Sequence, residues 1–166
     1  MVQREIERNV QPSILDRLTD LDHRSSAEPR VTLTESIRNF KFSIQRDLEW
    51  LLNTRRTADP VPEQLEELRK SVHWFGLPDI SSISKDSPLA REMLLQRVEE
   101  AVALFEPRLT DVKITMAELE GEARRRELHF SVEATLRMDP NPELVVFDTV
   151  LHFSSGEYEL AGARNA

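Results

Sequence analysis

A change of hydrophobic period at residues 105–109, Phe-Glu-Pro-Arg-Leu, constrains the fold of this 166-residue chain more than any other feature. Apolar residues recur at helical spacing before this step and alternate with polar residues after it, at Val112, Ile114 and Met116. Pro107 has no backbone N–H and disfavours helical geometry in the residue before it, so the helix is predicted to end near Glu106. The step therefore joins a helix directly to a strand.

The side chains of this step allow two interpretations. Phe105 and Leu109 are apolar and are expected to anchor the step in the core, whereas Glu106 and Arg108 place opposite charges on either side of the proline. In the first interpretation the two charges form a local salt bridge at the end of the helix. In the second they reach a partner protein. The five residues alone leave both interpretations open.

The clearest predicted helix starts at residues 32–35, Thr-Leu-Thr-Glu, which form a capping box. Its apolar face consists of residues spaced by three and four: Leu33, Ile37, Phe40, Ile44, Leu48 and Leu51. The helix runs out at residues 52–56, Leu-Asn-Thr-Arg-Arg. Arg55 and Arg56 are interpreted either as a complement to the negative end of the helix or as a contact to a partner.

Three further helical segments are predicted. Residues 12–22 form a short amphipathic turn behind the N-cap residue Ser13, and a polar linker follows at 23–30. A shorter helix ends at Gly76; its apolar positions are Leu65, Leu68, Val72 and Phe75, and Trp74 is expected to be in the core with Phe75. The last helix spans 88–106 behind Ser87 and Pro88, with an apolar face made of Met93, Leu94, Val98, Ala101, Val102 and Phe105.

The remainder of the chain alternates with the period of strands. Residues 112–116 and 128–138 are predicted to form a hairpin around a turn at 120–122, and residues 139–142 turn the chain into a third strand at 145–153. A short terminal strand is predicted at 157–160, and its edge is expected to accept a strand from a partner. Helices followed by a mostly antiparallel sheet of three to four strands predict an α+β fold.

Length and composition narrow the class of protein. The length fits one domain, which we predict at 31–160, after a docking segment and linker at 1–30 and before a tail at 161–166. A net charge of −8 argues against binding to nucleic acid. No stretch is apolar enough for direct membrane insertion, and the first residues lack the apolar core of a secretory signal, so a cytoplasmic location is expected.

No pattern in the sequence is typical of a catalytic, metal or cofactor site. The chain has no cysteine, and its four glycines are too far apart for a phosphate-binding loop. The four histidines, His23, His73, His129 and His152, do not have the spacing of metal ligands. We therefore expect no cofactor and no metal.

A hydrolase with two catalytic carboxylates is the alternative function considered. Glu106 could be paired with Asp111 or Glu133 across a cleft, as in a peptidoglycan-cleaving muramidase. A general acid of this kind needs a raised pKa, however, and Arg108 beside Glu106 would lower the pKa of the carboxyl group. This argument favours a non-enzymatic function.

Five stretches in the same order resemble the baseplate wedge proteins of contractile injection machines. They are residues 13–18 (SILDRL), 47–56 (DLEWLLNTRR), 71–79 (SVHWFGLPD), 105–109 (FEPRL) and 147–149 (FDT). The resemblance is closest to the TssE-like family of type VI secretion systems, which is akin to the lysozyme-like wedge protein of T-even phage tails. One departure is Trp74-Phe75, where the family pattern has a tyrosine directly before the glycine.

The resemblance implies a structural subunit with no small-molecule substrate. It implies a fold similar to the handshake domain of the sheath subunit. It also implies that the chain links the baseplate wedge to the tail sheath and templates sheath assembly. The implied partners are the wedge proteins TssF, TssG and TssK and the sheath subunits, in a baseplate at the inner face of the inner membrane. The implied partner-binding residues are Glu106, Pro107, Arg108, Asn53, Arg55 and Arg56.

Overall fold

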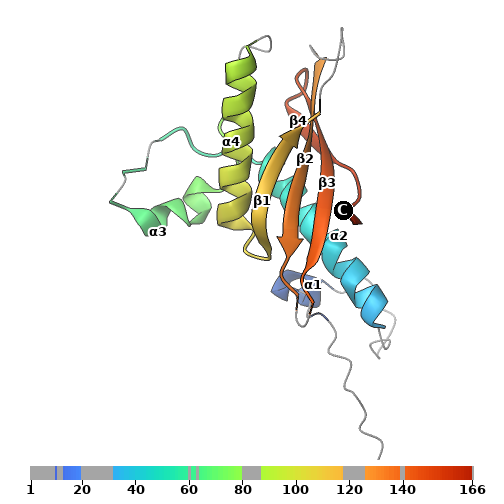
Figure 1. Cartoon of the computed structure of the whole chain (residues 1–166). Coiled ribbons are helices and arrows are strands. Elements are labelled where there is room, and N and C mark those ends of the chain that lie inside the picture. Colours follow the sequence, from blue (N-terminus) through green and yellow to red (C-terminus); the bar gives the residue numbers. More distant parts are fainter. Residues whose placement is uncertain are drawn as a thin grey trace, which may run out of the picture.

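The computed structural model describes residues 10, 13–19, 32–59, 61–62, 64–79, 87–117, 126–138 and 141–165. Helices come first and strands second, which confirms the predicted α+β fold (Figure 1). The linker predicted at 23–30 and the turn predicted at 120–122 lie outside the described residues.

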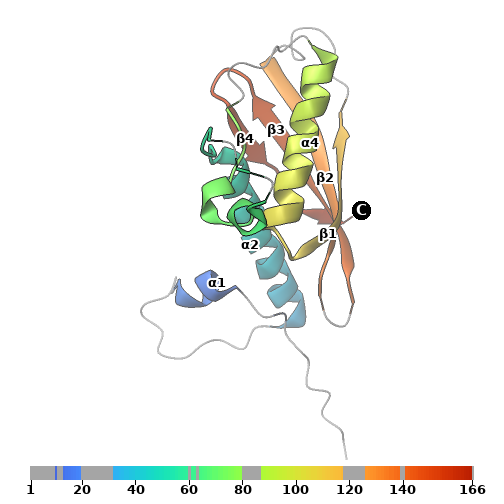
Figure 2. The ribbon, with the colours of Figure 1, turned by 90° about the vertical axis from the view of Figure 1, so that its left-hand side faces the viewer.

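Two long helices build one layer of the domain. Helix α2 (Leu33–Asn53) starts at the N-cap Thr32, whose hydroxyl accepts a hydrogen bond from the backbone N–H of Glu35. Helix α4 (Pro88–Phe105) starts in the same way at Ser87, with proline in its first turn. Both helices lie on the same face of the sheet (Figure 2). The buried residues of α2 are Ser36, Phe40, Ser43, Ile44, Leu48, Leu51 and Leu52.

The second layer is an antiparallel sheet in the order β1-β2-β3-β4, in which β5 also pairs with β3. The strands are β1 (Leu109–Met116), β2 (Glu127–Leu136), β3 (Glu143–His152), β4 (Glu157–Leu160) and β5 (Arg164–Asn165). Alternate residues of β2 are buried against the helices, from Leu128 to Leu136. As expected, β3 is a central strand.

Two details of the sheet differ from the predictions. Strand β1 starts at Leu109, three residues before the alternation becomes visible in the sequence, because a β-bulge interrupts the period. Asp111 has a φ of 53° there, and the pairing register shifts between Thr110 and Lys113. Within the tail predicted at 161–166, residues 164–165 form β5, a strand that was not predicted, and β5 pairs with β3.

The segment predicted as one helix before Gly76 is instead two short pieces. These are α3 (Glu66–Arg69) and the 3₁₀ helix η1 (Val72–Trp74). Val72, which was assigned to the apolar face, is 89% exposed, whereas Phe75 packs against the core as expected. Apolar spacing over eleven residues imitates a helix here, although Leu65 is exposed as well as Val72.

Helix α1 (Ile14–Leu18) is also present, but its apolar side chains do not face the core. Ile14, Leu15 and Leu18 are all exposed, so α1 is held by polar contacts instead. No helix among the described residues is both long enough and apolar enough to cross a membrane.

Candidate interaction site at the helix-to-sheet corner

The corner between α4 and β1 forms where the sequence predicts it. Glu106 is the C-cap of α4, and its backbone N–H still donates to the carbonyl of Val102 at 2.9 Å. Its own carbonyl accepts from the N–H of Leu109, the first residue of β1, at 3.0 Å. Leu109 is buried, and the Phe105 ring packs edge-on against Phe75 with centroids 5.2 Å apart. The chain therefore reverses direction around an anchored turn.

Glu106 and Arg108 form a bidentate ion pair inside the domain. Nε of Arg108 lies 2.6 Å from Oε1 of Glu106, and its second guanidinium nitrogen lies 2.5 Å from Oε2. Glu106 is only 4% exposed, although it lies at a chain reversal. Such a two-pronged pair fixes both the position and the orientation of the carboxylate. This geometry is the local salt bridge of the first interpretation.

The pair is one end of a longer chain of alternating charges. Arg108 also donates to Asp47 of α2 at 2.6 Å. The other carboxylate oxygen of Asp47 accepts from Arg46 at 2.8 Å, and Arg46 reaches Asp16 of α1 at 2.8 Å. Five charged side chains thus connect α1, α2 and the corner.

The five charged side chains of this series stabilise one another in their ionised forms. Burial alone would lower the pKa of Arg108, but hydrogen bonds and charges from Glu106 and Asp47 outweigh it and raise the pKa above its ordinary value. Arg46 behaves in the same way between Asp47 and Asp16. Because both oxygens of Glu106 accept from Arg108, the carboxyl group is held as an ion-pair acceptor and is badly placed to donate a proton as a muramidase acid.

The accessible part of the corner is small. Pro107 is exposed, and 21% of the Arg108 side chain remains accessible. Arg137 lies alongside and donates to the carbonyl of Pro107 at 3.5 Å. A partner would thus meet Pro107 and the rim of Arg108, while Glu106 would act by holding Arg108 in place. Partner binding by Glu106, Pro107 and Arg108 stays a prediction.

Asn53, another predicted partner residue, has an internal role. Its side-chain amide donates to the carbonyl of Tyr158 and accepts from the N–H of Tyr158, both at 2.9 Å. Gln45 donates to the carbonyl of Leu160, two residues further along the strand, at 3.0 Å. Side chains of α2 therefore occupy the outer edge of β4. The expectation that this terminal strand accepts a partner strand is wrong for the edge as it stands.

Arg55 and Arg56 lie beyond α2 and apart from the corner. No basic residue is present in the last turn of α2, so the helix-end interpretation of the two arginines is wrong. Arg55 is exposed and lies 3.7 Å from Asp79. The Arg56 guanidinium lies 4.1 Å from the centroid of the Trp74 ring. Their contact with a partner stays a prediction, at a second place on the surface.

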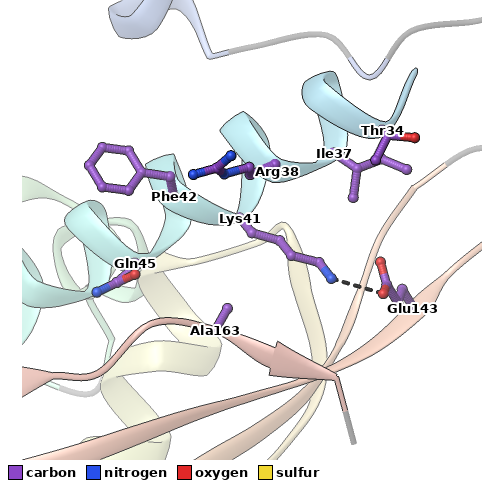
Figure 3. Close-up of a pocket in the computed structure, with 8 residues that line it drawn as sticks. All are labelled: Thr34, Ile37, Arg38, Lys41, Phe42, Gln45, Glu143 and Ala163. Carbon is purple, nitrogen blue, oxygen red and sulfur yellow. Dashed lines mark hydrogen bonds and ion pairs between the residues drawn. The ribbon is translucent and has the colours of Figure 1, made fainter. Parts of the chain in front are cut away.

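A hollow of about 500 Å³ lies between α2 and the C-terminal residues (Figure 3). Figure 3 shows Lys41 pointing across it to Glu143, with which it forms an ion pair at 2.8 Å. Lys41 is thus paired within the domain, whereas Arg38, which also lines the hollow, is exposed.

No group of three histidine, aspartate or glutamate side chains in the described ranges is arranged to hold a metal ion. Instead, His129 and His152 both approach Glu127 on the sheet, at 2.7 and 3.5 Å. The hydrogen bond from His129 lowers the pKa of the Glu127 carboxyl group.

The sequence reasoning missed three members of the charged chain: Asp16, Arg46 and Asp47. Asp16 and Asp47 lie inside stretches that carried the family resemblance, at residues 13–18 and 47–56. Their place in these stretches was the one signal that could have pointed to them. Nothing in their local pattern indicates a contact with a residue as distant as Arg108.

The chain matches a known protein family over much of its length. Residues 38–141 match the family described as baseplate wedge protein gp25. The matched region covers more than half of the chain and includes Asp47 and the corner, but ends before β3. A search of curated proteins found no match.

Proposed function

The chain belongs to the baseplate wedge protein gp25 family, and from this premise we propose that it is a structural subunit of a type VI secretion baseplate. In this proposal it links the wedge complex to the tail sheath and templates sheath assembly. Its partners are the wedge proteins TssF, TssG and TssK and the first sheath subunits. It works in the cytoplasm, in a baseplate at the inner face of the inner membrane.

The observation that carries the proposal is the immobilised corner. Two ion pairs hold Arg108 to Glu106 and Asp47, and the neighbouring Pro107 is exposed. A surface that is already rigid loses little conformational entropy when a partner binds. The corner therefore suits the wedge contact, with Pro107 and the rim of Arg108 meeting the partner.

The edge of β1 is the better candidate for the sheath contact. The N–H of Ala117 donates to His129, so in the antiparallel ladder Met116 and Phe130 form a non-hydrogen-bonded pair. The backbone groups of Met116 and Ile114 therefore point away from β2. Within the described part of the chain no hydrogen bond to these outward groups is present, whereas the β4 edge is occupied by Asn53 and Gln45. An added strand would find free donors and acceptors at β1.

Affinity purification with co-expressed TssF, TssG and TssK tests the wedge contact. The variant Pro107→Glu places a charge at the accessible tip of the corner without removing a hydrogen bond, since proline has no N–H. We expect it to fold normally and to lose the wedge proteins. Ser154→Glu adds the same charge in the exposed turn after β3, at the other end of the sheet, and should retain them.

Circular dichroism and thermal melting establish that both variants are folded. If folded Pro107→Glu still recovers the wedge proteins in wild-type amounts, the corner does not bind them and the proposal is overturned. Loss of the wedge proteins from both variants would equally overturn the assignment to this site.

A further inference from the structure

A second surface, which reaches Phe105 beside the corner but does not include Pro107, has the composition of a docking groove. It lies between α3 with η1 on one side and the outer face of α4 on the other, with a volume of about 920 Å³. Figures 1 and 2 both place α3 beside the lower half of α4. Among the residues that line this groove, the family resemblance implies partner binding only for Arg56, and it names no ligand for the groove.

The groove is basic, although the chain as a whole is acidic. Four cations line it, Arg56, Arg69, Lys70 and Arg97, against two carboxylates, Glu66 and Glu100. The whole chain has a net charge of −8. Lys70 is paired with Glu67 at 3.0 Å, but no ion pair of Arg56, Arg69 or Arg97 is present among the described residues. Three guanidinium groups therefore retain free donors.

The position of Arg56 in this groove is fixed by two contacts. Its guanidinium lies over the Trp74 ring at 4.1 Å, and its backbone N–H donates to Leu77 at 2.9 Å. Arg56 and Arg97 line the same groove. Burial and the charge of Arg97 lower the pKa of Arg56 by more than the charge of Glu100 raises it. Four cations gathered against only two carboxylates favour the binding of an anion.

The same groove also has an apolar side. Met93 is 51% exposed and Leu104 38% exposed, one near each end of the α4 face, and Phe105 lies at the end of that face. The sequence pattern assigned Met93 to the core, and the structure contradicts this. Exposed apolar side chains beside unpaired arginines are the composition found at protein interfaces.

We propose that this groove binds an acidic segment of a partner protein, whose carboxylates meet Arg56 and Arg97 while its apolar side chains cover Met93 and Leu104. A carboxylate matches the planar fork of a guanidinium in two hydrogen bonds. The apolar flank favours a peptide over a bare phosphate, because a phosphate would leave Met93 and Leu104 in water. This proposal stands independently of the wedge contact, since Pro107 does not line the groove.

The test measures fluorescence anisotropy of a labelled peptide of repeating Leu-Glu-Glu with the full chain. We expect binding that the double variant Arg56→Gln/Arg97→Gln weakens at least about tenfold, which corresponds to roughly 1.4 kcal/mol. The matched control is Arg17→Gln/Arg137→Gln, which removes the same charge from exposed positions outside the groove and should bind as the wild type does. A peptide of repeating Leu-Gln-Gln should not bind.

Other results would overturn the proposal. Equal weakening by both double variants would show unspecific attraction, and equal binding of the Leu-Gln-Gln peptide would show an apolar contact alone. Displacement of the peptide by inorganic phosphate, with tighter binding of a short RNA, would assign the groove to phosphate groups. Should the Arg56 variant fail to fold, Arg97→Gln alone decides, because Arg97 is exposed on α4.

Discussion

At the scale of single residues, Glu106 shows why a charged side chain can be buried at a chain reversal. Its two oxygens are both satisfied by Arg108, and Arg108 is satisfied again by Asp47. A buried ion pair of this kind adds little net stability, but removing one member leaves the other charge buried and unpaired. The pair therefore matters chiefly for the geometry of the corner.

Replacing Arg108 by alanine should lower the free energy of unfolding by about 3 kcal/mol, because the Glu106 carboxylate loses its partner. Urea denaturation measures this loss. Arg137→Ala, an exposed arginine at the same corner, should change stability by less than about 0.5 kcal/mol. Equal stabilities of the two variants would contradict the ion-pair geometry. Partner assays on Arg108→Ala therefore need a folding control.

Tyr158→Phe should leave stability unchanged or raise it by up to about 1 kcal/mol. The phenol oxygen is buried and has no hydrogen-bond partner in the described ranges, so its removal relieves a desolvation cost. The ring, which packs edge-on against Phe130, is retained. Thermal melting measures the effect, and a loss above about 1 kcal/mol would mean that the hydroxyl has a partner.

At the scale of elements, α1 is held by polar contacts. The capping box joins Ser13 to Asp16, the Asp16 carboxylate pairs with Arg46, and Ser36 of α2 donates to the carbonyl of Val10. The apolar residues of α1 remain available to a neighbouring subunit. Because an ion pair holds α1, the docking of α1 should depend on pH.

The pKa of Asp16 predicts the direction of this response. Burial alone would raise it, but Ser13 and Arg46 outweigh burial, so the folded pKa lies below the ordinary value of 3.8. The stabilisation is therefore complete above about pH 4 and is lost as the pH falls through the folded pKa. An NMR titration of α1 should give a midpoint below 3.8, and a midpoint at or above that value would contradict the ion pair.

The link between α2 and η1 depends on Gly76. Its φ is 98°, and a Cβ would lie 2.2 Å from the carbonyl oxygen of Thr54. Gly76→Ala should therefore destabilise the chain by roughly 2–4 kcal/mol, through both the strained φ and the backbone clash. Gly162→Ala meets open space and serves as the control in the same denaturation experiment. Similar stabilities of the two variants would mean that Gly76 does not lie against the carbonyl of Thr54.

At the scale of the whole molecule, the series of ion pairs from Asp16 to Glu106 connects elements that are distant in sequence. Asp47 stands at its centre, with α1 on one side and the corner on the other. The sheet is asymmetric as well, because α2 covers the β4 edge and leaves the β1 edge open. The proposed wedge and sheath contacts thus lie on separate parts of one rigid domain.

This separation predicts that the two contacts can be lost independently. Met116→Pro removes an N–H that points away from β2, so the ladder survives and stability should fall by less than about 1 kcal/mol relative to Met116→Val. Sheath subunits should no longer co-sediment with the folded variant, although the wedge proteins still co-purify. Pro107→Glu should give the opposite pattern. Joint loss of both partners from either folded variant would contradict two separate sites.

The sequence by itself determined the order of the two long helices and the first four strands, the helix caps, the position of the corner and the family. These depend on residues a few positions apart, whose spacing and cap chemistry act locally. It also indicated that Glu106 and Arg108 could pair. It failed for Val72 and Met93, since apolar spacing does not reveal which positions find a neighbour.

Only the tertiary structure decided that the corner is tied through Asp47 and Arg46 to α1, that Asn53 closes the β4 edge, and that Arg56 and Arg97 share a groove. Each of these contacts joins side chains far apart in the chain. Their formation depends on how α2 and α4 pack on the sheet, and that packing is the sum of many weak apolar contacts that no local pattern contains.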